Sequence, residues 1–303
     1  MQKTLQRYIE KNRAIAVQGE VADYIPELRK ASVNTLGATV ATADGDVVSA
    51  GDCSTQLTMQ SVSKVMTLIL ALMDLGEEAV FSRVGMEPTG DPFNSIYKLE
   101  VRREAKPLNP MINAGAIAVS SMIVGKSVED RLERIMDLVR VMSGNPDISY
   151  SREVYESEAA YGDRNRALAY FLKEHGMIED VEEVLDLYFR QCAIVVTCED
   201  LAKIGLCLAQ FGKNAEGRQV VPPDIARLVK TFMVTCGMYD ESGEFAIRVG
   251  IPAKSGVSGA IMASVPNRMG IGVVGPALNK RGNSIAGVKL LEDIAREWEL
   301  SIF

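Results

Sequence analysis

The chain has 303 residues, of which 47% are hydrophobic and 24% are charged, and its net charge is −7. This length and composition suffice for a full hydrophobic core and are typical of one compact globular unit. The acidic charge argues against nucleic acid as a partner, because proteins that bind it present a basic surface.

Local patterns predict helices and strands along the whole chain. Helical segments are expected up to about residue 16, from Ser61, at 128–142, 164–174, 180–192, 199–211 and 224–234, and from Ser284 to Trp298. Strands are expected in a hairpin from Leu36 to Ala50, which turns at Asp44-Gly45, and at 245–251, 257–265 and 268–275.

The order helix, two strands, helical insertion, three strands and helix predicts a mixed α/β fold. We expect an antiparallel five-stranded sheet flanked by helices, an all-helical subdomain, and an active site in the cleft between them. The chain should form a single catalytic domain over residues 1–303. Its α/β part is expected at about 1–60 and 240–303, and its helical part at about 61–239.

The distribution of apolar residues predicts a cytoplasmic protein. No segment reaches about 18 uninterrupted apolar residues, so no membrane partner is expected. The N-terminal residues lead into no signal-peptide core.

The cysteines and the histidine argue against a metal site. Five cysteines form an odd set without a Cys-x-x-Cys pair, and the single histidine, His175, precedes a glycine at the polar end of a predicted helix. Neither a zinc site nor a disulfide framework is therefore expected. We expect reduced, mostly buried thiols and no metal.

Ser61 and Lys64 form a Ser-x-x-Lys tetrad at the start of an apolar run that stops at Gly76. Residues three apart share a helix face, so the lysine amine can reach the serine hydroxyl. Burial at the end of an apolar helix lowers the pKa of a lysine, which makes the amine available as a base. The tetrad therefore predicts a nucleophile beside its base, although such pairs also arise by chance.

A second motif, Lys254-Ser255-Gly256, strengthens this prediction. It precedes a run of small and β-forming residues near the C-terminus. Serine acyl-transfer enzymes of the β-lactamase and penicillin-binding type combine Ser-x-x-Lys with Lys-Thr/Ser-Gly on an edge strand, in this order. Small residues beside the lysine let a substrate lie against the strand, where backbone N–H groups face a developing oxyanion.

Longer blocks around these motifs resemble the serine-dependent glutaminases over nearly the whole chain. The blocks are, in order, Ala22-Asp23-Tyr24-Ile25-Pro26-Glu27-Leu28, Gln60-Ser61-Val62-Ser63-Lys64, Asn109-Pro110-Met111-Ile112-Asn113, Ser157-Glu158, Gly162-Asp163-Arg164-Asn165, Tyr188-Phe189-Arg190-Gln191-Cys192, Cys236-Gly237-Met238-Tyr239-Asp240 and Pro252-Ala253-Lys254-Ser255-Gly256-Val257. The resemblance implies a β-lactamase-like fold and hydrolysis of L-glutamine to L-glutamate and ammonia through an acyl-enzyme. It also implies that the enzyme needs no metal or organic cofactor, and that it forms a homodimer or homotetramer.

The same resemblance assigns roles to individual residues. It makes Ser61 the nucleophile and Lys64 its base, with Tyr24 and Tyr239 lining the reacting amide. The backbone N–H groups of Ser61 and Val257 would form the oxyanion hole. The residues expected to hold the amino-acid end of the substrate are Asn113, Glu158, Asn165 and Tyr188. A carboxylate suits an α-ammonium group, and amides and a phenol suit an α-carboxylate.

Other interpretations remain open at this stage. Taken alone, Asn113 is typical of a turn, Tyr188 of a helix core and Glu158 of a solvated face. Family members often carry two glycines after the Lys-Ser-Gly-Val stretch, whereas Ala260 follows Gly259 here. The alternative functions are another serine acyl hydrolase of the same fold and a catalytically silent amino-acid-binding module.

Overall fold

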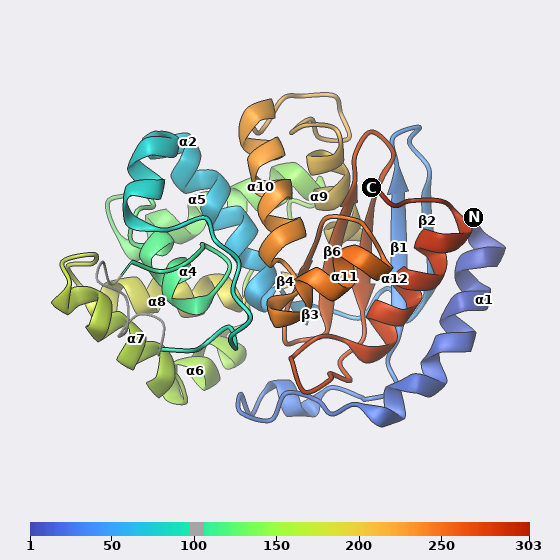
Figure 1. Cartoon of the computed structure of the whole chain (residues 1–303), viewed down its shortest axis with the longest axis horizontal. Helices are drawn as coiled ribbons and strands as arrows, with labels where there is room; N and C mark the ends of the chain where they lie inside the picture. Colours follow the sequence, from blue (N-terminus) through green and yellow to red (C-terminus); the bar gives the residue numbers. More distant parts are fainter. Residues whose placement is uncertain (97–105) are drawn as a thin grey trace.

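The computed structural model describes residues 1–96 and 106–303 (Figure 1). No helix in these two ranges is both long enough and apolar enough to cross a membrane.

The α-helices are α1 (Gln2–Arg13), α2 (Ser63–Arg83), α4 (Asn113–Ser120), α5 (Val128–Ser143), α6 (Arg152–Ala160), α7 (Asp163–Glu174), α8 (Val181–Cys192), α9 (Cys198–Ala209), α10 (Pro223–Cys236), α11 (Ser242–Arg248) and α12 (Ile285–Glu297). The strands are β1 (Gly37–Thr42), β2 (Val47–Gly51), β3 (Leu57–Thr58), β4 (Val195–Val196), β5 (Ala253–Ser255), β6 (Ala260–Val265) and β7 (Met269–Val274). Short 3₁₀ turns include η3 (Gln60–Val62) and η4 (Tyr239–Glu241).

Five strands form one sheet in the order β2-β1-β7-β6-β5, and every neighbouring pair is antiparallel. This confirms the predicted five-stranded antiparallel sheet. Residues 253–255, which include the Lys-Ser of the second motif, lie on the edge strand β5. A separate pair, β3 and β4, which the sequence patterns did not predict, joins the chain just before Ser61 to the segment after α8.

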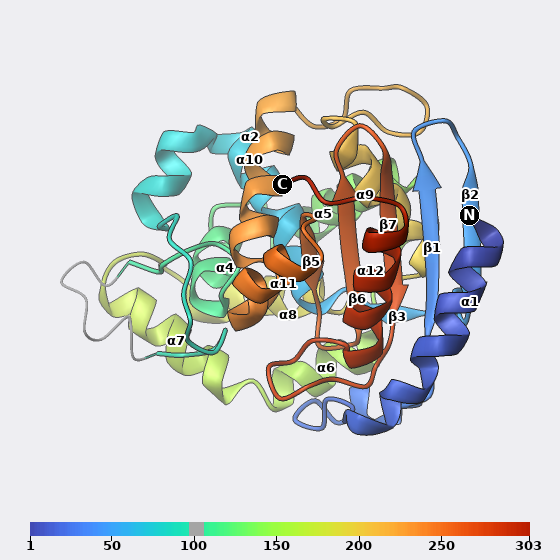
Figure 2. The same cartoon turned by 45° about the vertical axis from the view of Figure 1, so that its right-hand side comes forward.

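Helices cover both faces of the large sheet (Figure 2). Helices α1 and α12 pack against each other, and Leu290 and Ile294 of α12 belong to one apolar cluster with Ile261 and Ile271 of the sheet. Helix α9 covers the opposite face and contacts β7, β6 and β1. Its close approach depends on glycine, because a Cβ at Gly272 would lie 2.0 Å from a backbone oxygen of α9.

The helical subdomain lies beside the sheet (Figure 1). Its core combines the apolar faces of α2, α4, α5, α8 and α10. At Gly76, where the apolar run of the sequence stops, φ is +80° and ψ is 169°, which divides α2 into two helical parts. The first part of α2 is buried and carries Lys64, so Ser61 and Lys64 lie where the two regions meet.

The predicted strand at 245–251 is wrong, because these residues begin inside helix α11. Phe245, Ile247 and Val249 alternate in the sequence as in a strand. In the structure, however, Ser242, Phe245 and Val249 are buried while Ile247 is 88% exposed, which is helical periodicity. The strand predicted at 257–265 begins only at Ala260, since residues 256–259 form a turn.

Candidate active site

A tight turn between β3 and α2 positions Ser61. Gln60 has a φ of +46°, a rare conformation for a residue with a side chain, and the N–H of Val62 donates to the Met59 carbonyl. The chain therefore bends sharply and enters α2 through η3. Ser61 is 8% exposed at the floor of a pocket, as expected for a nucleophile at a helix start.

Lys64 lies in the first turn of α2 and is 1% exposed. Its Nζ donates to the Met111 carbonyl at 3.2 Å and to Asn113 Oδ1 at 2.6 Å. Burial lowers the pKa of the Lys64 amine to about 8, although the nearby Cys192 and Glu158 act in the opposite direction. A substantial fraction of this lysine is therefore neutral near physiological pH and available as a base.

Tyr239 faces Ser61 from the 3₁₀ turn η4. Its φ is +55°, so the backbone holds the phenol in an uncommon conformation. The Tyr239 hydroxyl is buried and has no hydrogen-bond partner within the described ranges. Burial raises the pKa of this phenol, and the nearby Ser61 hydroxyl has a smaller, lowering effect on it. An unpaired phenol beside the Ser61 hydroxyl is free to form a hydrogen bond with a ligand.

Lys254 supports Tyr239 and was not among the predicted site residues. It is fully buried, its Nζ lies 4.5 Å from the centre of the Tyr239 ring, and it donates to the carbonyls of Gly237 and Ser255 at 3.1 and 2.7 Å. Burial lowers its pKa well below the usual lysine range. The Lys-Ser-Gly motif pointed to this residue, but only the fold reveals its contact with Tyr239.

Two backbone N–H groups are available beside the Ser61 hydroxyl. The turn that carries Val257 lies against the Ser61 turn, because a Cβ at Gly256 would be 3.5 Å from the Ser61 nitrogen. Ser258 Oγ donates to the Thr58 carbonyl at 2.6 Å and fixes this arrangement. Within residues 1–96 and 106–303, neither the Ser61 nor the Val257 N–H donates a hydrogen bond. Two free N–H groups on adjoining turns are the kind of donors that an oxyanion hole requires.

A compact pocket of about 80 Å³ extends from Ser61 into the helical subdomain. Seven predicted site residues line it, namely Tyr24, Ser61, Asn113, Glu158, Asn165, Tyr188 and Val257. Gln60, Phe93 and Cys192 also belong to its wall. Lys64 and Tyr239 do not line the pocket themselves. Lys64 is hydrogen-bonded to Asn113 of the wall, and Tyr239 lies next to Ser61. The fold thus brings together residues from separate parts of the chain.

The far end of the pocket is polar and buried. Glu158 is 6% exposed, and Gln60 Nε2 donates to its Oε2 at 3.4 Å. Burial raises the pKa of Glu158 to about 8 and so favours the protonated acid near neutral pH. Asn113 Nδ2 donates to Asn165 Oδ1 at 2.9 Å, and Tyr188 is 2% exposed. A carboxyl opposite amides and a phenol suits a zwitterionic ligand.

Tyr24 reaches the pocket from the loop before β1. Its ring is half exposed, whereas its hydroxyl points inward and lies near Tyr239, Glu158 and Cys192. Burial raises the pKa of this phenol well above its ordinary value. Tyr24 therefore closes the pocket as a neutral hydrogen-bonding group.

The cysteines form no disulfides, and the histidine does not line the pocket. All five cysteines are free, and Cys192 lies in the pocket wall, where burial raises the pKa of its thiol. His175 is exposed at the end of α7, stacked on Phe171. Among the residues that the structure describes, no group of three or more His, Cys, Asp or Glu side chains is arranged to hold a metal ion.

The antiparallel sheet, the helical insertion and the buried Ser-x-x-Lys at their junction define a fold of the serine β-lactamase type. A glutaminase family profile matches residues 19–303. The chain is 58% identical to a glutaminase of Geobacillus thermodenitrificans over 301 residues, which cover 99% of this chain and 97% of the relative. It is 56% identical to a glutaminase of Alkaliphilus metalliredigens over the full length of both. The chain therefore belongs to the glutaminase family.

Solved structures agree with this assignment. The probable glutaminase of Bacillus subtilis superposes with a TM-score of 0.94 at 44% identity, over 100% of this chain and 97% of that chain. A covalent complex between a Bacillus subtilis glutaminase and 5-oxo-L-norleucine, formed by reaction with 6-diazo-5-oxo-L-norleucine, has a TM-score of 0.92 at 43% identity. It covers 100% of this chain and 99% of that chain.

Proposed function

We propose that this protein hydrolyses the side-chain amide of L-glutamine to L-glutamate and ammonia through an ester on Ser61. The observation that carries the proposal is the buried Lys64 amine, one helical turn from Ser61, with a pKa lowered to about 8. Membership of the glutaminase family supports the choice of substrate. The covalent complex of the Bacillus subtilis relative with a norleucine derivative supports a covalent intermediate.

The reaction begins when neutral Lys64 takes the proton of the Ser61 hydroxyl. Ser61 Oγ attacks the amide carbon, and the developing oxyanion accepts hydrogen bonds from the N–H groups of Ser61 and Val257. Ammonia leaves after protonation, which Tyr239 or Tyr24 can relay because both phenols are neutral and lie at the reacting end. Water then hydrolyses the γ-glutamyl ester and restores Ser61.

The polar end of the pocket holds the amino-acid part of glutamine. Glu158 pairs with the α-ammonium group, and Asn165 and Tyr188 bind the α-carboxylate. Asn113 connects the base to the substrate-binding residues. Its side-chain oxygen accepts a hydrogen bond from Lys64, and its side-chain nitrogen donates one to Asn165. Binding of the substrate is thereby linked to the position of the base.

We further propose that the protein acts in the cytoplasm as a homodimer or homotetramer, without a metal, an organic cofactor or nucleic acid. Residues 1–303 would form a single catalytic domain, with an α/β part at about 1–60 and 240–303 and a helical part at about 61–239, of which α9 packs on the sheet. Light scattering of the purified protein tests the subunit number, and fractionation of its native cells tests the location.

The deciding experiment measures ammonia and glutamate release from L-glutamine by the wild type and by Ser61→Ala. Loss of the nucleophile should lower turnover by about 10³-fold or more while circular dichroism stays unchanged. Turnover above about a tenth of the wild type in Ser61→Ala would contradict the ester mechanism. Hydrolysis of a β-lactam but not of glutamine would favour another serine acyl hydrolase, and glutamine binding without turnover would favour a silent binding module.

A further inference from the structure

Asn109 is a fully buried asparagine that lies outside the group of residues lining the glutamine pocket. Its side-chain amide forms three hydrogen bonds, and all three partners are backbone groups. Oδ1 accepts from the N–H groups of Met111 at 3.0 Å and Ile112 at 3.2 Å, and Nδ2 donates to the Glu87 carbonyl at 2.8 Å. One side chain therefore holds a tight turn and ties it to a second segment of the chain.

The turn carries both groups that accept hydrogen bonds from the Lys64 amine. Lys64 Nζ donates to the Met111 carbonyl at 3.2 Å and to Asn113 Oδ1 at 2.6 Å. The N–H of the same Met111 donates to Asn109 Oδ1. Asn109 is therefore linked to the base through a single residue, Met111.

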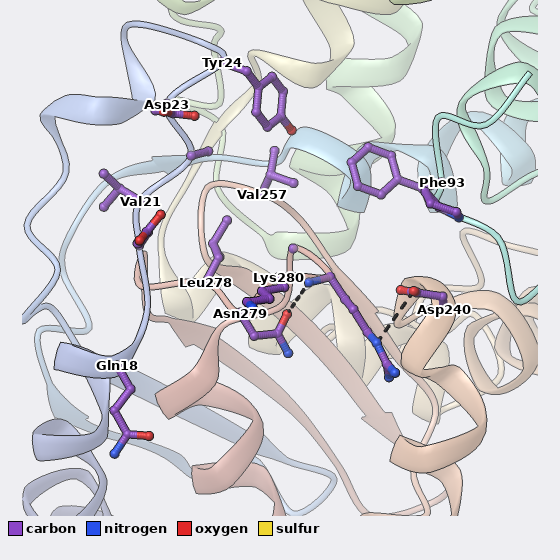
Figure 3. A pocket seen from close by; sticks show the side chains of 15 residues that line it. Gln18, Val21, Asp23, Tyr24, Phe93, Asp240, Val257, Leu278, Asn279 and Lys280 are labelled. Atoms are coloured by element: carbon purple, nitrogen blue, oxygen red, sulfur yellow. Dashed lines mark hydrogen bonds and ion pairs between the residues drawn. The ribbon is translucent and has the colours of Figure 1, made fainter.

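The start of α4 is placed by this turn and by backbone contacts. Ile112 occupies the N-cap position of α4 and forms no side-chain cap hydrogen bond. The N–H of Asn113, the first residue of the helix, donates at 2.9 Å to the carbonyl of Phe93, which lies near Val257 in Figure 3. A Cβ at Gly115 would lie 1.9 Å from the Asn109 backbone oxygen, so the turn packs directly on α4. Loss of the Asn109 amide should therefore loosen the segment 109–113 that bonds Lys64.

The second anchor of Asn109 lies on the segment that follows α2. Gly85 and Glu87 donate to the carbonyls of Pro107 and Leu108 at 2.7 and 2.9 Å, respectively. The hydrogen bond from Asn109 Nδ2 to the Glu87 carbonyl extends this pairing. An aspartate could accept from the turn but could not donate to this carbonyl when ionised, so an amide suits both contacts.

A similar asparagine turn occurs away from the site. Asn145 also precedes a proline, and its Oδ1 accepts from the Asp147 N–H at 3.0 Å. Its Nδ2 donates to the side chain of Asp200, in α9, at 2.9 Å. None of these three residues lines the glutamine pocket. Asn109 and Asn145 thus share the local turn chemistry and differ in what the turn carries.

We propose that Asn109 is a positioning residue of the base, whose amide holds the Met111 carbonyl and the Asn113 side chain where they keep the Lys64 amine within reach of Ser61. The proposal rests on the mechanism proposed above, in which Lys64 takes the Ser61 proton. Misplacement of a reacting group by about 1 Å can lower the rate by about 10²-fold.

The expected signature is a loss of kcat that exceeds the rise of KM. Glu158 and Tyr188, which we propose hold the amino-acid end of glutamine, belong to α6 and α8 and not to the turn. Asn109→Ala should therefore lower kcat by about 10- to 100-fold, while KM rises by less than about threefold.

Asn109→Asp should restore the turn, because it keeps an oxygen for both N–H groups. Its kcat should return to within about fivefold of the wild type on the alkaline plateau, whereas that of Asn109→Ala should stay low at every pH. The plateau is compared because an added carboxylate favours the ammonium form of Lys64 at lower pH. The titratable groups that act on this amine, Cys192, Glu158 and Lys254, are the same in all variants.

The test measures ammonia release from L-glutamine against pH for the wild type, Asn109→Ala, Asn109→Asp and the matched control Asn145→Ala. Complete reaction with 6-diazo-5-oxo-L-norleucine, which forms a covalent complex with a Bacillus subtilis glutaminase, counts the intact sites, and kcat is calculated per labelled chain. Asn145→Ala should keep kcat within about twofold of the wild type. If Asn109→Ala does not fold, Asn109→Ser replaces it; its hydroxyl can accept from one N–H, and it should lose about fivefold in kcat.

Three results would overturn the positioning role and leave the glutaminase reaction intact. They are a kcat of the Asn109→Ala or Asn109→Ser variant equal to that of Asn145→Ala, a plateau of Asn109→Asp as low as that of Asn109→Ala, and a rise of KM without a loss of kcat. Absence of ammonia release by the wild type would instead overturn the proposed function, and the role of Asn109 with it.

Discussion

Lys64 Nζ and Asn113 Oδ1 are joined by a 2.6 Å hydrogen bond that is buried from water. The neutral amide accepts from the lysine without adding a charge, so burial remains the main influence on the lysine and keeps its pKa at about 8. A carboxylate in the same place would favour the ammonium form. An asparagine at this position therefore suits the role of base that we propose for Lys64.

This relationship predicts a pH shift in Asn113→Asp. The kcat of the wild type should rise with pH about a midpoint near 8, because only the neutral Lys64 amine accepts the Ser61 proton. An adjacent carboxylate raises the pKa of a lysine by about 1 to 3 units, so the midpoint should move upward and turnover at neutral pH should fall by about tenfold or more. Stopped assays of ammonia release between neutral and alkaline pH give both midpoints.

Asn113→Ala is the control, because it removes the hydrogen bond without adding a charge. It should lower turnover with no upward shift of the midpoint. The same midpoint in Asn113→Asp and the wild type would mean that Lys64 is not the titrating base.

Glu158 predicts a proton release when glutamine binds. Burial raises its pKa to about 8, so near neutral pH the carboxyl is mostly protonated, whereas an α-ammonium group beside it would favour the carboxylate. Titration calorimetry of Ser61→Ala with glutamine, in buffers of different ionisation enthalpy, should detect this proton. Glu158→Gln in the same background should release less, and as a single variant it should lose about tenfold or more in kcat/KM. Unchanged kcat/KM in Glu158→Gln would remove Glu158 from the substrate site.

The sequence predicts the site best where function depends on local spacing. Ser61 and Lys64 stand three residues apart, and Lys254 and Val257 belong to one short motif, so each pair is close whatever the fold. The contacts of Lys64 with Asn113 and of Lys254 with the Tyr239 ring join segments far apart in the chain. No local pattern contains that information.

The fold shows the same division. The hairpin at Asp44-Gly45 follows from turn chemistry and is confirmed by the β1–β2 pairing. Residues 245–251 misled the prediction, because alternation in a short apolar segment fits a strand and one face of a helix equally well. The close packing of α9 on the sheet depends on Gly270 and Gly272, which the sequence shows only as small residues in a strand.

Lys230 predicts a stabilising substitution away from the site. Its side chain is 5% exposed, and its Nζ has no hydrogen-bond partner within the described ranges. The same atom lies 4.0 Å from the centre of the Phe211 ring. Burial lowers its pKa to about 8. Between about pH 8 and the ordinary lysine pKa near 10.4, the unfolded chain binds more protons at Lys230 than the folded chain does. The free energy of unfolding therefore rises with pH in this window. Below the window, the folded protein carries the full cost of burying a charged amine.

Lys230→Met should therefore raise the free energy of unfolding at neutral pH by about 1 to 3 kcal/mol. The gain should shrink as the pH rises through the window above 8, because the wild type recovers stability there. Urea unfolding at several pH values measures it, with Lys213→Met at an exposed lysine as the control. An equal change of the free energy of unfolding in both variants, or a lower value in Lys230→Met, would contradict the inferred cost of burying the Lys230 amine.

The covalent intermediate can be trapped and located. A glutamine analogue with an electrophilic carbon at the amide position should alkylate Ser61 once per chain, because Lys64 activates that hydroxyl and the pocket aligns the carbon with it. Intact-mass measurement and peptide mapping should find the adduct between Gln60 and Lys64, and glutamate should slow its formation. The competing nucleophile in the same pocket is Cys192, whose thiol has a raised pKa and is therefore poorly reactive. Cys192→Ser should still be labelled, and Ser61→Ala should not. An adduct on Cys192 in the wild type, with Ser61 unmodified and activity lost, would replace the serine mechanism with a thiol mechanism.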